Sequence, residues 1–250
     1  MSAHGLPCWY ELATNDTETA KAFYSMVLGW TWADSGMPGM TYLLAKADAA
    51  MVAGLFPADP AMPQGWTHYI AVDDADALVE KATALGGSIV VHPTDIPNTG
   101  RFAMLIDPQG ASFAILQPLP DGTGGAFDQS KSGHGNWHDL ASPDAAAALA
   151  FYAALFGWTE ASAMQIGPSM TYHVIARGDL QFGGIFSEAG YDGPARWTVY
   201  FGAPSVRAAV DLVKAAGGQV QHGPAEVPGG ALIIHCTDPS GAVFALVGPA

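Results

Sequence analysis

Two carboxylates occupy matched places in the chain, and each lies two residues after a tryptophan. Glu11 follows Trp9, Asp139 follows Trp137, and the second pair lies 128 positions after the first. Each pair falls in a short run whose alternation is typical of a β-strand, where residues two apart share a face. An aromatic environment removes water from a carboxylate, which raises its pKa and suits it to accept a proton or bind a cationic ligand. We therefore predict Glu11 and Asp139 as the catalytic or ligand-pairing acids.

A structural interpretation of these acids stays open beside the functional one. Acids on a solvated sheet face cost little free energy, and such a face is common in antiparallel sheets. Glu11 and Asp139 would then hydrogen-bond the linker or the facing domain and hold the two halves of the chain in place.

Other catalytic arrangements find no support in the sequence. It contains no His-x-His, His-Glu-x-x-His or Gly-x-Ser-x-Gly spacing, and neither cysteine has an evident histidine partner. His68 and His138 fall on the side of their strands that faces a helix, so we expect satisfied, partly buried imidazoles. We expect His222 in a loop, and the sequence does not fix the facing of His235.

The elements that position the acids form a repeat. Phe23-Tyr24 and Leu28-Gly29-Trp30 recur as Phe151-Tyr152 and Phe156-Gly157-Trp158 at the same offset of 128. In each copy the apolar residues recur at helical spacing and the glycine stands where a helix cap belongs. A second strand–helix unit follows in each half, and each half ends with an Asp-Pro-x-Gly turn. The chain therefore predicts four modules of one strand, one helix and further strands.

The composition limits the function classes. Half of the residues are apolar, so a large core is expected, and the net charge of −14 with only nine Lys and Arg offers no basic surface for nucleic acid or an anionic membrane. We expect no signal peptide, and no apolar run is long enough to span a membrane. Two cysteines far apart form no disulfide framework. We expect a cytoplasmic protein.

Several of these features together resemble the vicinal oxygen chelate superfamily, which holds glyoxalase I, extradiol dioxygenases and bleomycin-resistance proteins. They are the strand before Asp16, the run from Phe23 to Trp30, Ala71-Val72-Asp73-Asp74, and Asp107-Pro108-Gln109-Gly110. Their recurrence extends the resemblance to nearly the whole chain, and more narrowly to tandem two-domain glyoxalase-like proteins. The resemblance implies an α+β fold in which two βαβββ modules wrap into a U-shaped sheet around one cavity.

The same resemblance sets our expectations for domains and assembly. Four modules imply two glyoxalase-like domains, residues 1–119 and residues 135–250, each with two βαβββ modules and a U-shaped sheet. A Gly-, Pro- and Ser-rich linker, residues 120–134, joins them. Because the chain holds all four modules, we expect a monomer, with a homodimer through outer surfaces as the alternative.

Enzymes of this superfamily usually hold a divalent metal through His, Glu or Gln on the first strand of a module and Glu on the last strand. Here the matching positions carry side chains that are poor ligands or none: Trp9, Thr67, Ala114, Trp137, Thr198 and Ala245. We therefore expect no metal and no other cofactor. The alternative is a register shift of two residues, which would make Glu11 and Asp139 ligands.

We predict a protein that binds a small organic molecule in aromatic-lined cavities without the usual metal. One alternative is a metal-dependent glyoxalase-type lyase acting on a reactive aldehyde or its thiol adduct. Another is a metal-free isomerase, cyclase or lyase with Glu11 or Asp139 as the base. The predicted binding residues are inward-facing aromatic or hydroxyl side chains and one arginine: Trp9, Thr67, Tyr69, Arg101, Trp137, Thr198 and Tyr200. Arg101 has a competing role as the surface partner of an acid.

Overall fold

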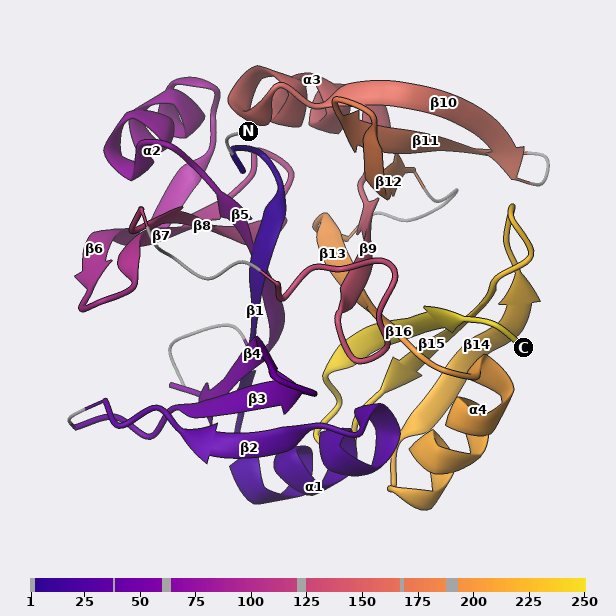
Figure 1. The fold of residues 1–250 in the computed structure, drawn as a ribbon. Coiled ribbons are helices and arrows are strands. Elements are labelled where there is room, and N and C mark those ends of the chain that lie inside the picture. The colour runs from indigo at the N-terminus through magenta and orange to yellow at the C-terminus, as the bar shows by residue number, and fades with distance from the viewer. Residues whose placement is uncertain (1–2, 38, 60–63, 121–124, 167–168, 188–192) are drawn as a thin grey trace. The chain divides into compact units, whose positions relative to one another are not determined.

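The computed structural model describes residues 3–37, 39–59, 64–120, 125–166, 169–187 and 193–250. One arrangement of a strand, a helix and three strands occurs four times along these residues (Figure 1). This confirms the predicted α+β fold of four βαβββ modules. Residues 121–124 of the predicted linker lie outside the described part.

The first module comprises β1 (Pro7–Thr14), α1 (Thr17–Leu28), β2 (Thr31–Asp34), β3 (Leu43–Ala47) and β4 (Ala50–Pro57). The second comprises β5 (Gly65–Ala71), α2 (Ala75–Ala84), β6 (Ser88–Ile96), β7 (Gly100–Ile106) and β8 (Ser112–Pro118). The third comprises β9 (Gly135–Ala141), α3 (Ala145–Phe156), β10 (Thr159–Ile166), β11 (Met170–Arg177) and β12 (Leu180–Phe186). The fourth comprises β13 (Arg196–Gly202), α4 (Val206–Ala215), β14 (Gln219–Glu226), β15 (Leu232–Thr237) and β16 (Val243–Gly248).

The strands form two eight-stranded sheets. Their orders are β2-β3-β4-β1-β5-β8-β7-β6 and β10-β11-β12-β9-β13-β16-β15-β14. In every module the first strand pairs in parallel with the last, and the remaining neighbours are antiparallel. The parallel pair requires a crossover connection, which the helix of each module provides.

The chain also divides into two compact units that take segments from both halves. Unit 1 comprises Met1–Cys8, His68–Thr123 and His138–Trp197, and unit 2 comprises Trp9–Thr67, Gly124–Trp137 and Thr198–Ala250. The second and third modules thus supply most of unit 1, and the first and fourth supply most of unit 2. The domain boundaries at 119 and 135 stay a prediction.

Helix ends follow the local sequence. The Asp16 side chain accepts a hydrogen bond from the Thr19 backbone N–H at the start of α1, and Gly29 ends it with a left-handed φ of 70°. The third module repeats this with Asp144 at the start of α3 and Gly157, φ 69°, at its end. A left-handed backbone favours glycine, which explains the glycine that recurs directly after α1 and α3.

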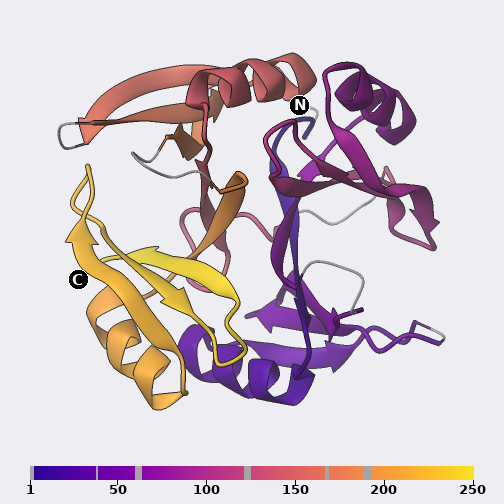
Figure 2. The same cartoon turned by 180° about the vertical axis from the view of Figure 1, so that it is seen from behind.

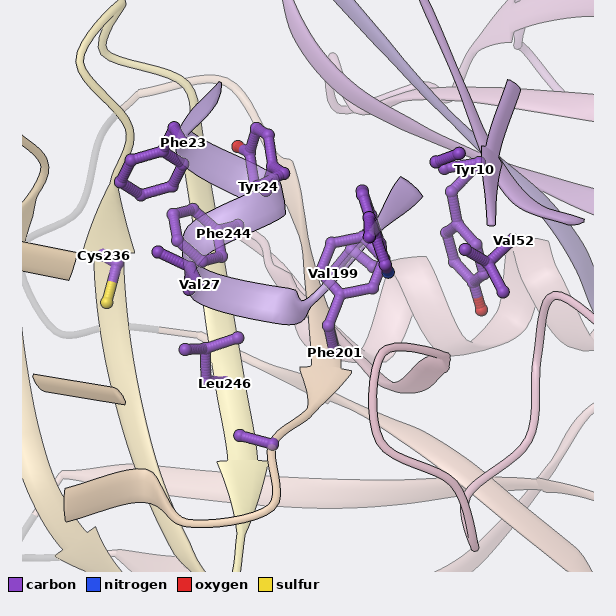
Figure 3. Packing of buried hydrophobic residues seen from close by; sticks show 14 of the residues in the cluster. Tyr10, Phe23, Tyr24, Val27, Val52, Val199, Phe201, Cys236, Phe244 and Leu246 are labelled. Carbon is purple, nitrogen blue, oxygen red and sulfur yellow. The ribbon is translucent and has the colours of Figure 1, made fainter. Parts of the chain in front are cut away.

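The core of unit 2 lies between helices and strands from the first and fourth modules. Phe23 and Tyr24 of α1 pack edge-on against Phe244 of β16, with ring centroids 5.8 Å and 5.5 Å apart (Figure 3). In the same unit α4 covers β14 to β16 (Figure 2). Unit 1 repeats the contact, because Tyr152 of α3 packs 5.6 Å from Phe113 of β8.

The Asp-Pro-x-Gly turns anchor a buried polar network. One oxygen of Asp238 accepts from the backbone N–H groups of Ser240 and Ala242, each over 2.9 Å. The other accepts from the Tyr24 hydroxyl over 3.2 Å, and that hydroxyl accepts from the Trp66 indole over 2.8 Å. Unit 1 holds the same trio in Asp107, Tyr152 and Trp197.

The first strand of the first module alternates as predicted from Trp9 to Leu12. Tyr10 and Leu12 of β1 are buried in the core with α1, whereas Trp9 and Glu11 are half-buried on the other face. We call the face of a module's strands that lies away from its helix the open face.

Of the described helices, the longest have 12 residues and none has the length and apolar content of a membrane span.

Candidate functional site

A carboxylate, a phenol and an indole form a hydrogen-bonded chain on the open face of the first module. The Trp9 indole N–H donates to the Tyr42 hydroxyl oxygen over 3.0 Å. The Tyr42 hydroxyl donates to Glu11 Oε1 over 2.6 Å. Burial, followed by the charge of Glu11, raises the pKa of Tyr42 well above its usual value. The phenol therefore keeps its proton at neutral pH and holds the carboxylate by a charge-assisted hydrogen bond.

The third module repeats the phenol–carboxylate pair. The Tyr172 hydroxyl donates to Asp139 Oδ1 over 2.5 Å, and the Asp139 side chain is buried on β9. Trp137 lies half-buried two residues earlier on the same strand. The structure thus places both predicted acids on open faces and joins each to a tyrosine that the sequence analysis did not select.

In each module a glycine on the strand next to the acid's strand allows the tyrosine to reach the acid. Gly54 of β4 is the register partner of Glu11, and Gly184 of β12 is the partner of Asp139. A Cβ atom at Gly54 would lie 2.0 Å from the Tyr42 hydroxyl oxygen, and the twin position is equally crowded by the Tyr172 ring. No other residue type leaves room for the ring.

Gly54→Ala should therefore push the Tyr42 ring away and break both of its hydrogen bonds. We expect the Trp9 indole N–H resonance to shift in an NMR spectrum, as it should in Tyr42→Phe, which removes only the hydroxyl. The stability loss should be about 1.5–3 kcal/mol, the range for a hydrogen bond to a charged group. An unchanged Trp9 signal in Gly54→Ala would show that the ring does not depend on the glycine.

The fourth module carries a different polar cluster on its open face. The Tyr200 hydroxyl lies 2.9 Å from His235 Nε2, and His222 packs edge-on against His235 with centroids 5.7 Å apart. His222 lies in β14, directly opposite His235, so its prediction as a loop residue is wrong. In the second module, Met104 stands at the position equivalent to His235 and Val91 at the position equivalent to His222.

Three further predicted binding residues also lie on first strands. Tyr69 is buried on β5 with its ring 6.3 Å from Phe102. Thr67 and Thr198 are half-buried on β5 and β13. Their open-face positions agree with the predicted strand alternation.

Arg101 is bound by two carboxylates. Its guanidinium donates to both oxygens of Asp76, over 2.8 Å and 3.0 Å, and to Asp95 over 2.8 Å. These hydrogen bonds raise the pKa of the guanidinium. Arg101 lines a groove of about 730 Å³, but its contacts favour the alternative of a surface ion pair over an anion anchor.

The side chains present do not fit the divalent metal that the resemblance implies. Within the described ranges, no three side chains of His, Cys, Asp or Glu converge on one point. Glu11, the residue that a register shift would recruit, is bonded to Tyr42 instead. Burial raises the pKa of Cys8 and of Cys236 to about 12, so neither thiol is ionised at neutral pH.

Two histidines lie in the core of unit 1, on the helix-facing side as predicted. His138 Nδ1 lies 2.9 Å from the Phe182 carbonyl oxygen, and the His68 ring lies 5.3 Å from the His138 ring. His68 Nε2 is buried with no hydrogen-bond partner, so the prediction of a satisfied imidazole is wrong there. Burial lowers the pKa of His138 to about 4 and that of His68 well below its usual value.

A comparison with protein families matches residues 8–115 and 135–246 to the Glyoxalase/Bleomycin resistance protein/Dioxygenase superfamily. The chain belongs to this superfamily. CFP32 of Mycobacterium tuberculosis (strain CDC 1551 / Oshkosh), named provisionally as a glyoxylase, is 35% identical over 98% of this chain and 95% of that protein. The anthracycline biosynthesis protein DnrV of Streptomyces peucetius is 31% identical over 98% of this chain and 94% of its own.

Solved structures show the same superfamily fold. The Mn(II)-bound glyoxalase from Novosphingobium aromaticivorans superposes with a TM-score of 0.70 at 20% identity, covering 99% of this chain and 83% of that chain. The 2,3-dioxygenase LapB from Pseudomonas sp. KL28 superposes with a TM-score of 0.69 at 17% identity, covering 100% and 94%. At these identities the likeness concerns the fold alone.

Proposed function

We propose that this superfamily member binds a small organic molecule on the open faces of its first and third modules without a resident metal. The polar anchors are Glu11 with Tyr42 and Asp139 with Tyr172. The observation that carries the proposal is the repetition of this phenol–carboxylate pair across a glycine in both modules.

The fold itself does not require an acid at this place. The matching position on the first strand of the second module is Tyr69, and that of the fourth module is Tyr200. Tyr69 and Tyr200 are both buried, so this place on the strand accommodates a residue without a charge. The acids in two of four modules are therefore best explained by a ligand.

The neighbouring groups indicate the ligand chemistry. In the first module an indole lies beside a carboxylate whose tyrosine keeps its proton. Such a surface suits a flat, largely apolar molecule that carries a hydrogen-bond donor or a protonated amine. The name of the Streptomyces relative, an anthracycline biosynthesis protein, supports an aromatic ligand.

A metal-free enzyme is the second candidate. Glu11 would accept a proton from the bound molecule while the Tyr42 hydroxyl, which donates to the same carboxylate, holds it in place, an arrangement suited to isomerase or lyase chemistry. The name of the mycobacterial relative supports such an activity. A metal-dependent lyase receives less support, because the matching ligand positions hold tryptophan, threonine and alanine.

The test combines Glu11→Gln with Asp139→Asn, which keep the shape and remove the charges. With a fluorescent anthracycline as the probe, we expect the double variant to bind at least about tenfold more weakly, about 1.4 kcal/mol. Asp95→Asn, an exposed acid on β6, is the matched control and should bind as the unaltered protein does. Elemental analysis of the same samples should find less than stoichiometric Zn, Ni, Mn or Fe.

Binding that survives both substitutions while the unfolding midpoint falls would show that the acids are structural. About one metal per domain, removable by a chelator with loss of binding, would contradict the metal-free part of the proposal. Turnover of a carbonyl substrate that Glu11→Gln abolishes would favour the enzyme.

A further inference from the structure

The first module fills the space beside its helix with an indole. Trp32 of β2 is half-buried and packs edge-on against Trp30, with ring centroids 5.9 Å apart. Its indole N–H donates to the Ser25 hydroxyl on α1 over 2.9 Å. This side chain closes the gap between α1 and the neighbouring strands.

The third module leaves the matching space open. The repeat offset of 128 places Glu160 where the first module has Trp32, and Ala153 where it has Ser25. A pocket of about 250 Å³ lies there between α3 and the strands β10 to β12. Its walls include side chains of helix and strands, among them Leu149, Tyr152, Ala153, Trp158, Glu160 and Ile175.

Besides the change from Trp32 to Glu160, two differences between the copies make the pocket wall more apolar. Leu149 replaces the charged Lys21, and Ala153 replaces the hydroxyl-bearing Ser25. Ile175 stands near the place of Ala45 and fills part of the space, yet the pocket persists. The open pocket leaves these apolar walls partly in contact with water, which costs stability relative to a filled site. Its retention together with apolar walls indicates an occupant.

The chemistry of the walls defines that occupant. The buried ring of Trp158 supplies an aromatic surface, and the Glu160 carboxylate stands at the pocket with 44% of its side chain exposed. The nearest basic partner of Glu160 is His173, whose Nδ1 lies 3.5 Å away. A planar ring would occupy the apolar part, and a donor or cationic group on it would face the carboxylate.

We propose that this pocket binds a planar aromatic molecule of indole size that carries an N–H or ammonium group directed at Glu160. The first module supports an occupant of this size, because there the chain's own Trp32 fills the equivalent space. The pocket lies on the helix side of the third module, whereas Asp139 and Tyr172 lie on the open face. It is thus a second site, separate from the one under the proposed function.

Indole and tryptamine are the probes. The Trp158 indole N–H, which donates to the Gly5 carbonyl oxygen over 2.6 Å, is the NMR reporter. We expect both probes to shift this resonance saturably, with tryptamine binding about fivefold more tightly. Glu160→Gln should reduce tryptamine affinity to the level of indole. Glu160→Trp, which introduces the twin module's residue, should abolish binding of both probes.

Circular dichroism shows whether Glu160→Trp is folded. If it is not, Ala153→Leu, which fills the pocket from the helix, should likewise abolish binding of both probes. Glu11→Gln with Asp139→Asn should leave the indole-induced shift of the Trp158 resonance unchanged, which separates this pocket from the open-face site. The proposal is overturned if millimolar indole shifts no Trp158 signal. It is also overturned if a folded pocket-filling variant binds indole as tightly as the unaltered protein.

Discussion

Asp238→Ala should lower the free energy of unfolding by about 3 kcal/mol or more, because a buried group left without a partner costs about 1–3 kcal/mol and two part-buried N–H groups lose their acceptor as well. The substitution leaves the Tyr24 hydroxyl and the backbone N–H groups of Ser240 and Ala242 without their hydrogen-bond acceptor. Tyr24 is fully buried, so water cannot replace the lost acceptor. The loss should therefore exceed that of Gly54→Ala, which breaks hydrogen bonds between partly buried side chains.

Urea unfolding measures the effect, and the chain supplies matched comparisons. Asp107→Ala removes the twin acid of unit 1 and should cost a similar amount. Asp95→Ala breaks only an exposed ion pair with Arg101 and should cost less than about 1 kcal/mol. Tyr24→Phe combined with Asp238→Asn gives a double-mutant cycle for the hydroxyl–carboxylate bond. A loss no larger than that of Asp95→Ala would show that the network contributes little.

The sequence predicted the local part of this network and not its partners. The Asp-Pro-x-Gly pattern predicts a turn. The backbone N–H groups two and four residues after the aspartate donate to its side chain in both copies, so this part of the network is set within five residues. The partner Tyr24 lies 214 positions from Asp238. Which helix packs against which strand depends on the contacts between modules, and a repeat offset does not contain that information.

For the candidate site, too, the sequence predicted one part and missed another. Alternation along β1 correctly placed Trp9 and Glu11 on the face away from α1, because side-chain direction is fixed by a period of two. Tyr42 was missed, since it lies just before β3 and its reach depends on the register between strands. A signal was present in the matched tyrosines of the two halves, each followed by a matched glycine at Gly54 or Gly184.

Acidification from pH 6.5 to about pH 4 should destabilise the protein by about 3 kcal/mol through His138 alone, at about 1.4 kcal/mol per pH unit. Burial is the main cause of its lowered pKa, from 6.5 to about 4. Above pH 6.5 the imidazole is neutral in both states and stability is unaffected. Between the two values only the unfolded chain binds the proton, so stability falls as pH falls. Burial also lowers the pKa of His68, so its protonation in the unfolded chain adds to the loss of stability on acidification.

Urea unfolding at pH 7 and at pH 4.5 measures this loss, and variants separate it from the titration of the acids. His138→Gln keeps a donor for the Phe182 carbonyl and cannot be protonated, so its stability should fall less between the two pH values than that of the unaltered protein. His68→Phe also removes the buried Nε2 that has no partner, so stability at pH 7 should hold or rise. His92→Gln, an exposed position on β6, is the matched control and should leave the pH dependence unchanged. If His138→Gln loses as much stability on acidification as the control, the buried imidazole is not the group that opposes protonation in the folded chain.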